Sequence, residues 1–329
     1  MRRPHFEALH PVCPLCRAAL AIGTVIRESD DDVLEGILLC GGCRREFPIV
    51  DGIPVIVGPI RTWLAANPLQ LLMRDDLSPE IESLIGDVLG PGSPYDLLRQ
   101  HTGMYADDHY RAGSAASVIE DIDAGNGGPL LDIGCATGGT TFQLAQKSGA
   151  LTLGIDLNFA MLRVASRVLR EGRVRYARRR IGVVYDRRDE MIEMPARELV
   201  DFWCCDAGAL PFADATAGTA ASVNVIDCNT SPQQSIAELA RVVRPGGLAI
   251  ISTPYDWSPS ATPYENWIGG HSQRGPHAGA AEPLLRDLIA EHFTIEREET
   301  DVPWRVRLHD RSAVDYRVHL FVAKRRNIS

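Results

Sequence analysis

The feature that most constrains this chain is a glycine-rich turn between an apolar and an amphipathic segment, GGPLLDIGCATGGTTFQLAQK at residues 127–147. The apolar run predicts a strand at 130–133, and the pattern after it predicts a helix that begins near Thr140. Gly134, Gly138 and Gly139 would let the backbone turn sharply and approach a ligand at the helix N-terminus. Because dinucleotide-binding domains use the same device, the turn alone does not decide the ligand.

The segments after this turn continue the alternation of strand and helix. A second strand, ALTLGID, ends at Asp156, and a third, VDFWCCD, ends at Asp206 and is followed by AGALPF. A fourth lies in ASVNVIDC, and LARVVRPGGLAIISTP predicts a helix, a Pro-Gly-Gly turn and a fifth strand. Residues 293–310 and 315–326 predict two closing antiparallel strands. The order predicts an α/β fold with a Rossmann-like, mostly parallel sheet of seven strands.

This order resembles the class I S-adenosylmethionine-dependent methyltransferases over roughly residues 110–329, and a nicotinamide domain would not account for DAGALPF or RPGG. The resemblance implies that the glycine turn surrounds the methionine part of the cofactor, that Asp156 binds the ribose, and that Asp206 with Ala207 contacts the adenine. Ala136 stands where the family commonly has its middle glycine. The cofactor-binding residues that the resemblance implies are Asp132, Gly134, Ala136, Gly138, Asp156, Leu157, Asp206, Ala207 and Asn224.

Two cysteine pairs near the N-terminus indicate a metal site. CPLC and CGGC are separated by 23 residues that read as a β-hairpin, and REFPIVDGIPVIV adds a strand, a turn and a strand. Two CxxC pairs in one short segment favour a closed four-thiolate zinc site over a redox pair. The ligands would be Cys13, Cys16, Cys40 and Cys43. FPIVDGIP and the cysteine pattern resemble the Trm112-like zinc ribbons over about residues 9–57, which implies a structural zinc and a scaffolding or interaction role.

These observations predict three regions: a Trm112-like zinc ribbon at 1–60, a helical linker or cover at 61–110, and a class I methyltransferase domain at 111–329. The net charge of −9 gives a nucleic-acid backbone no general attraction. No apolar run approaches the ~18 residues that span a membrane, and the N-terminus lacks the apolar region of a signal peptide. We therefore expect a cytoplasmic enzyme with a small-molecule acceptor, no membrane partner, and either a homodimer or a protein partner bound through the ribbon.

An aromatic loop, TPYDWSPSATPYENWIGG, follows the fifth strand directly. Its three prolines exclude a regular helix, and its position places it at the carboxyl edge of the sheet, where open α/β proteins bind ligands. The rings would either anchor the loop to the core or form the wall of a pocket, and the position favours the wall.

This loop, with VIDCNTSP, VPWRVRLHDR and the insertion REGRVRYARRRIGVVYDRRDE, resembles the methyltransferase domain of ovothiol biosynthesis, a 4-mercaptohistidine (5-thiohistidine) N-methyltransferase family. The family implies methylation of an imidazole ring nitrogen of a thiolated histidine. DCNTSP departs from the family's more apolar segment, and the zinc ribbon replaces its usual fusion to a sulfoxide synthase. The acceptor would then be a thiohistidine-like or histidine-derived metabolite, or another specialised metabolite methylated on oxygen or nitrogen.

Roles on the acceptor side follow from this resemblance. Asp227, Tyr255 and Asn266 would orient the ring or accept its proton, and His309 would be a base. Arg307 would bind a carboxylate through its planar guanidinium. The alternative to an acceptor-side role for Arg307 and His309 is a purely structural one, on a surface strand with salt bridges. The predicted substrate-binding residues are Trp257, Tyr264, Trp267 and Arg307.

Residues 163–188 carry ten arginines, which favours a solvated helix and hairpin over a lid or an anion-binding patch. The arginines also keep a competing function open, a zinc-ribbon ribosomal RNA guanine N-methyltransferase, which has the same domain order. A further alternative, from outside the enzymes, is a binding subunit that activates another methyltransferase. The charge of −9 and the aromatic loop argue against the first, and the intact set of cofactor residues argues against the second.

Overall fold

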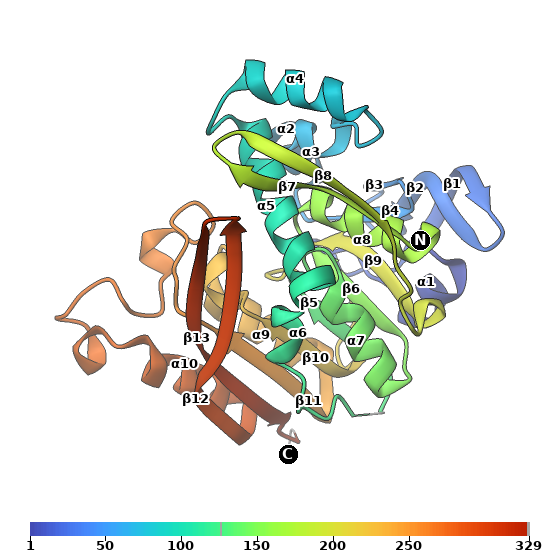
Figure 1. Cartoon of the computed structure of the whole chain (residues 1–329). Coiled ribbons are helices and arrows are strands. Elements are labelled where there is room, and N and C mark those ends of the chain that lie inside the picture. The colour runs from blue at the N-terminus through green and yellow to red at the C-terminus, as the bar shows by residue number, and fades with distance from the viewer. Residues whose placement is uncertain (126, 328–329) are drawn as a thin grey trace.

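The computed structural model describes residues 1–125 and 127–327. Eleven of its strands form one sheet in the order β1-β2-β3-β4-β9-β6-β5-β10-β11-β13-β12, and β7 and β8 form a separate hairpin (Figure 1). Among the described residues, no helix combines the length and the apolar composition needed to cross a bilayer.

Seven strands of this sheet confirm the predicted mostly parallel core. Strands β9, β6, β5, β10 and β11 are parallel to one another, and β13 lies antiparallel between β11 and β12. Their bounds are β5 (Leu130–Ile133), β6 (Thr152–Asp156), β9 (Val200–Cys205), β10 (Ala217–Val223), β11 (Val243–Thr253), β12 (Phe293–His309) and β13 (Ser312–Arg325). The chain order reverses between β5 and β10, so the crevice expected for a ligand lies at the carboxyl ends of these strands.

The N-terminal segment extends the same sheet. Its strands are β1 (Leu20–Ser29), β2 (Asp32–Cys40), β3 (Glu46–Val50) and β4 (Ile53–Ile56), after a short helix α1 (Arg3–Leu9). The predicted hairpin and the strand-turn-strand after it are confirmed. Strand β4 then pairs in parallel with β9, Val55 opposite Cys204 and Ile56 opposite Cys205. Phe6 packs on Trp203 with ring centroids 6.1 Å apart, so the ribbon and the core strands share one apolar core.

Helices cover both the sheet edge and the ligand crevice. Those of the predicted cover are α2 (Ile60–Ala66), α3 (Pro68–Leu72), α4 (Pro79–Leu89) and α5 (Pro94–Asp107). Pro68 and Pro79 are the first residues of α3 and α4, a position where a missing N–H costs no hydrogen bond. Ser93 caps α5, with its Oγ accepting a hydrogen bond from Asp96 N at 3.2 Å. A π-helical turn (Asp108–Ala112) and the short helix α6 (Ser114–Ser117) then lead toward β5.

The remaining helices pack on the core sheet, and the long C-terminal hairpin β12–β13 rises beside α5 (Figure 1). These helices are α7 (Gly139–Ser148), α8 (Phe159–Glu171), α9 (Pro232–Val242) and α10 (Ala281–His292). The predicted start of α7 near Thr140 is confirmed. The Pro-Gly-Gly turn is instead absorbed into β11, where Gly246 has φ +76° and the register against β10 shifts.

The arginine-rich insertion forms the end of α8 and the hairpin β7 (Arg173–Ile181) and β8 (Val184–Met191), as predicted. The prediction that this insertion is solvated throughout is wrong, however, because Arg163 and Arg178 are buried. Arg163 pairs with Asp51 of the ribbon at 3.0 Å, and its other nitrogens donate to carbonyl oxygens of residues 70, 71 and 73. A guanidinium has five donors, so backbone carbonyls can satisfy it inside the protein. Through these contacts the insertion holds the cover helices and the ribbon against the core.

Candidate cofactor and acceptor site

A cavity of about 510 Å³ lies at the carboxyl ends of β5, β6, β9 and β10. It collects the residues that follow these four strands, which is where the sequence placed the cofactor. Eight of the nine predicted cofactor residues line this cavity: Asp132, Gly134, Ala136, Asp156, Leu157, Asp206, Ala207 and Asn224.

The glycine turn after β5 adopts conformations that only a few residues tolerate. Gly134 has φ +77°, and a Cβ there would come within 2.2 Å of Val225. Ala136 has φ +48°, the left-handed region in which a side chain is strained, and its N–H donates to Asp156 Oδ2 at 2.8 Å. This bond ties the end of β6 to the turn after β5, and so holds two walls of the cavity together.

Gly138 is the predicted cofactor residue that does not line the cavity. Its φ is +91°, and a Cβ there would meet the Phe202 ring at 2.6 Å and Ala165 at 2.8 Å. Glycine is therefore required at this position because the turn packs closely on the core where α7 begins, and not because a ligand approaches it.

Two carboxylates on adjacent strands present acceptors to the cavity. Asp156 also accepts from Asn158 N at 2.7 Å, and Asp206 Oδ1 accepts from Gly208 N at 2.8 Å. Each carboxylate oxygen can accept more than one hydrogen bond, so both keep capacity for a ligand. Ribose hydroxyls and an adenine amino group are donors of the kind that this pair accepts. The donor and acceptor set and the size of the cavity thus fit S-adenosylmethionine.

Asp132 is buried at the base of the cavity. Its Oδ2 accepts hydrogen bonds from the hydroxyls of Thr140 and Thr141, each at 2.7 Å. Burial raises the pKa of Asp132 to about 6, and these two hydrogen bonds oppose the shift. The carboxylate thereby fixes the first turn of α7 against the end of β5.

The cover of the cavity comes from residues that the sequence did not single out, His101, Tyr105 and His109 from α5 and the π turn and Trp304 from β12. His109 Nδ1 accepts a hydrogen bond from Gly139 N at 2.9 Å, so Nε2 carries the ring proton. Burial lowers the pKa of His109 to about 4, so the ring is neutral at physiological pH. Trp304 stacks on Tyr316 with centroids 5.0 Å apart. Tyr105 and Trp304 thus give one side of the cavity an aromatic wall.

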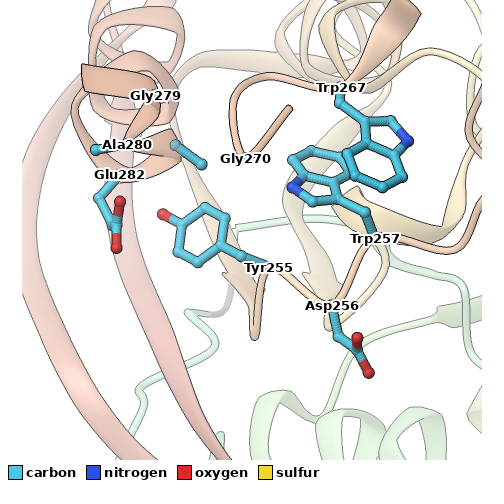
Figure 2. A pocket seen from close by; sticks show the side chains of 9 residues that line it. Tyr255, Asp256, Trp257, Trp267, Gly270, Gly279, Ala280 and Glu282 are labelled. Atoms are coloured by element: carbon cyan, nitrogen blue, oxygen red, sulfur yellow. The ribbon is translucent and has the colours of Figure 1, made fainter. Parts of the chain in front are cut away.

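The aromatic loop contributes to two cavities. Ser258, Ser260 and Ala261 line the cavity described above. Tyr255, Trp257 and Trp267 line a second one of about 460 Å³, in which the two indoles stack with centroids 5.7 Å apart (Figure 2). The fourth predicted ring, Tyr264, is 57% exposed and lies outside both linings, packed against Trp267 at 5.2 Å.

Asp227 lies at the base of this loop. It is 1% exposed, and its carbonyl oxygen accepts from Ser258 N at 3.1 Å and from Thr262 Oγ1 at 3.2 Å. Burial raises the pKa of its carboxyl to about 6, and Oδ1 has no hydrogen-bond partner among the described residues. Its neighbour Cys228 lines the cofactor cavity.

Asp227 is in neither lining, and Asn266, Arg307 and His309 are not brought to either cavity. Asn266 Nδ2 donates to Thr230 O at 2.9 Å and braces the loop from outside. Arg307 is exposed, and His309 lies at the tip of the β12–β13 hairpin, where its Nδ1 accepts from Arg311 N at 3.2 Å. Side chains alternate along β12, and Trp304 and Val306 take the inward positions. This placement agrees with a surface strand and gives no support to acceptor-side roles for Arg307 and His309.

The four predicted metal ligands form one cluster. The sulfur atoms of Cys13, Cys16, Cys40 and Cys43 all lie within 4.8 Å of one another. Two of the separations are 3.7 Å and 3.4 Å. A tetrahedral site with Zn–S bonds of ~2.3 Å has sulfur–sulfur edges of about 3.8 Å. The cluster therefore fits a structural zinc ion held by four thiolates.

Comparison with known proteins agrees with both parts of the chain. The family described as a methyltransferase domain matches residues 131–251, and the family described as Trm112p-like protein matches residues 12–52. The O-methyltransferase cnsE of Penicillium expansum is 27% identical over 178 residues, which are 54% of this chain and 55% of that protein. Methyltransferase GfsG of Streptomyces halstedii is 28% identical over 135 residues, 41% of each chain. The chain thus spans about half the length, or less, of these relatives.

Solved structures are similar at a lower level. A complex of the Haloferax volcanii Trm112 methyltransferase activator and a methyltransferase matches with a TM-score of 0.45 and 13% identity, over 71% of this chain and 98% of that one. Phosphoethanolamine N-methyltransferase 2 of Haemonchus contortus, in complex with S-adenosyl-L-methionine, matches with a TM-score of 0.42 and 15% identity, over 69% of this chain and 57% of that one. The chain thus contains a segment that matches a methyltransferase domain, at residues 131–251, and a Trm112p-like segment, at residues 12–52, and its cavity at the carboxyl ends of the strands fits S-adenosylmethionine.

Proposed function

We propose that this protein transfers the methyl group of S-adenosylmethionine to a small molecule bound against the aromatic wall of the cofactor cavity. The observation that carries the proposal is one continuous lining. It holds the carboxylates of Asp156 and Asp206 at the strand ends, and Tyr105 and Trp304 on the covering side. A flat acceptor between these rings would share a closed space with the cofactor, and proximity and exclusion of water are most of what methyl transfer requires.

The acceptor that we propose is an imidazole ring nitrogen of a thiohistidine-like or histidine-derived metabolite. A neutral ring nitrogen attacks the methyl carbon with its lone pair, the carbon–sulfur bond breaks, and the sulfur leaves as a neutral thioether. The ring becomes cationic and returns to neutrality by losing its N–H proton. In this proposal the buried carboxyl of Asp227, the chain neighbour of Cys228 in the cavity lining, supplies the negative charge that favours the cationic ring. The sequence resemblance of the aromatic loop supports this choice of acceptor.

The test is to incubate the full chain with S-adenosylmethionine and a panel of histidine, 5-thiohistidine, other thioimidazoles and ribosomal RNA, and to follow product mass. A gain of one methyl group on a thioimidazole is expected. An Asp206→Ala variant, which removes a cofactor acceptor, serves as the inactive control. Methylation of RNA alone would refute the proposal, as would transfer to none of the imidazoles while S-adenosylhomocysteine still binds.

The RNA methyltransferase alternative rests on the arginine-rich insertion, and the ion pairs there weaken it. Arg173 and Arg175 both pair with Asp189, and Arg187 pairs with Glu82. Guanidinium groups that are neutralised inside the protein release few counterions from a phosphate backbone. We therefore favour a small acceptor, and we assign these arginines to holding the cover over the cavity.

A further inference from the structure

The second cavity, between the aromatic loop and the start of α10, is not used by the proposed methyl transfer. Its volume is about 460 Å³, and its lining lacks lysine and arginine. In Figure 2 the hydroxyl of Tyr255 and the carboxylate of Glu282 lie on one side of it, and the stacked indoles lie on the other. Its lining includes Tyr255, Asp256, Trp257, Trp267, Gly270 and Glu282.

A partly buried chain of hydrogen bonds determines whether the Tyr255 hydroxyl donates or accepts. Its hydroxyl lies 2.7 Å from Nδ1 of His319, and Nε2 of His319 lies 2.9 Å from Glu298 Oε1. Arg286 donates to Glu298 through Nε at 3.1 Å, and the guanidinium lowers the pKa of that carboxyl. An ionised carboxylate only accepts, so Nε2 of His319 carries a proton. Burial lowers the pKa of this histidine, so the ring is neutral at physiological pH and Nδ1 accepts. The Tyr255 hydroxyl therefore donates to His319, and the lone pairs of its oxygen are left for the cavity.

Backbone geometry shows that Tyr255 is held in this position. Its φ is +56°, the left-handed region that a residue with a large side chain rarely adopts. His319, at 3% exposed, is buried beneath it on β13. Asp256, next in the chain, turns its carboxylate away and accepts from Tyr316 Oη at 2.9 Å. The side chains of the lining thus include the phenol oxygen of Tyr255, the exposed carboxylate of Glu282 and aromatic rings, and no lysine or arginine.

We propose that this cavity binds the ammonium group of a small organic amine, with Tyr255 Oη and Glu282 as hydrogen-bond acceptors and the rings of Tyr255, Trp257 and Trp267 as its wall. A primary ammonium has three donors and a full positive charge, and aromatic faces attract such cations. Arg286, whose charge acts on Tyr255, is paired with Glu298. The amine belongs either to the methyl acceptor or to a separate ligand. Recognition by this cavity is the same in both cases, and the inference does not require the proposed methyl acceptor.

The experiment measures binding of 2-phenylethylamine to the full zinc-loaded chain by calorimetry, with 2-phenylethanol as the neutral counterpart. Glu282→Gln removes the charge from an exposed position, so folding should be unaffected, and it should weaken amine binding about tenfold. Tyr255→Phe removes the phenol oxygen and should weaken it several-fold. Glu291→Gln, an exposed glutamate on the same helix, should leave amine affinity unchanged. The proposal is overturned if the amine does not bind, if the alcohol binds equally well, or if Glu282→Gln has wild-type affinity.

A second arm separates the two sources of the amine. Binding of 2-phenylethylamine is repeated with S-adenosylhomocysteine present, and again with the best methyl acceptor found in the panel. Competition with the acceptor assigns the cavity to the acceptor's own amine, and simultaneous binding assigns it to a separate ligand. Cofactor affinity is measured independently. Loss of methyl transfer with intact amine binding therefore counts against the proposed function alone, and loss of amine binding with intact transfer counts against this site alone.

Discussion

Asp227 is the residue at which we expect stability and function to oppose each other. Its carboxyl is 1% exposed, and burial raises its pKa to about 6 from an ordinary value of 3.8. The pKa of the Asp227 carboxyl is higher in the native protein than in the unfolded chain. Its contribution to stability is therefore fully present below pH ~4 and is lost as pH rises through about 6. The difference corresponds to at most about 3 kcal/mol of unfolding free energy at pH 8.

Asp227→Asn should therefore make the protein more stable at neutral pH. The amide has no charge to bury, and its carbonyl oxygen can still accept the hydrogen bonds that Asp256 and Thr253 give to the carboxylate. Its NH₂ group would meet the position where Oδ1 lacks a partner, which costs about 1 kcal/mol or more. The expected net gain at pH 8 is about 1–2 kcal/mol, with little or no gain at pH 4.5.

Urea unfolding at pH values from 4.5 to 8 measures this difference. Asp132, whose pKa burial also raises to about 6, titrates in both proteins and cancels in the comparison. Asp87→Asn, at an exposed position of α4, is the control for removing one carboxylate, and its effect should stay within about 0.5 kcal/mol at all pH values. The prediction is refuted if Asp227→Asn is less stable than the wild type at pH 8. It is also refuted if the variant gains the same unfolding free energy at pH 4.5 as at pH 8. If the charge serves methyl transfer, the stabilised variant should turn over more slowly.

Three further predictions concern the cofactor, the metal and the cover. Asp156→Asn should weaken S-adenosylhomocysteine binding about tenfold or more in calorimetry, because it removes a charged acceptor that also holds Ala136; unchanged affinity would contradict that role. A strong zinc chelator should unfold the ribbon, seen as loss of circular dichroism and release of one zinc ion per chain, and cofactor affinity should fall with it. Arg163→Met should lower the unfolding free energy by about 2–4 kcal/mol in urea titrations, because Asp51 and three carbonyl oxygens lose their donor, whereas the exposed Arg305→Met should change it by less than about 1 kcal/mol.

The parts of the fold that the sequence predicted are those whose signals are local. Strand, turn and helix from residue 130 to the start of α7 follow from a run of apolar residues and three glycines, and the cysteine cluster follows from spacing alone. The strand ends at Asp156 and Asp206 also carry their own signal, a carboxylate directly after an apolar run. For such features the residues that determine the structure lie close together in the chain.

The parts that the sequence did not predict depend on distant contacts. His109 reaches the cavity because a π turn after α5 directs its Nδ1 at Gly139 N, and Trp304 reaches it from a strand that begins near residue 293. Neither has a local motif. Burial of Arg163 was missed for a related reason, since its partners are carbonyl oxygens on another segment and a count of charges does not reveal them.

The pairing of β4 with β9 gives a physical reason for joining a zinc ribbon to this fold. Ile56 lies opposite Cys205, and the next residue is Asp206, a carboxylate of the cofactor cavity. Without β4, strand β9 would be the open edge of the core sheet, and edge strands fray and pair with other chains. Zinc binding stabilises the folded ribbon, and the ribbon includes β4. By pairing with β9, β4 in turn stabilises the strand that positions Asp206. We therefore expect the metal to support cofactor binding through the β4–β9 pairing, without contacting the cofactor.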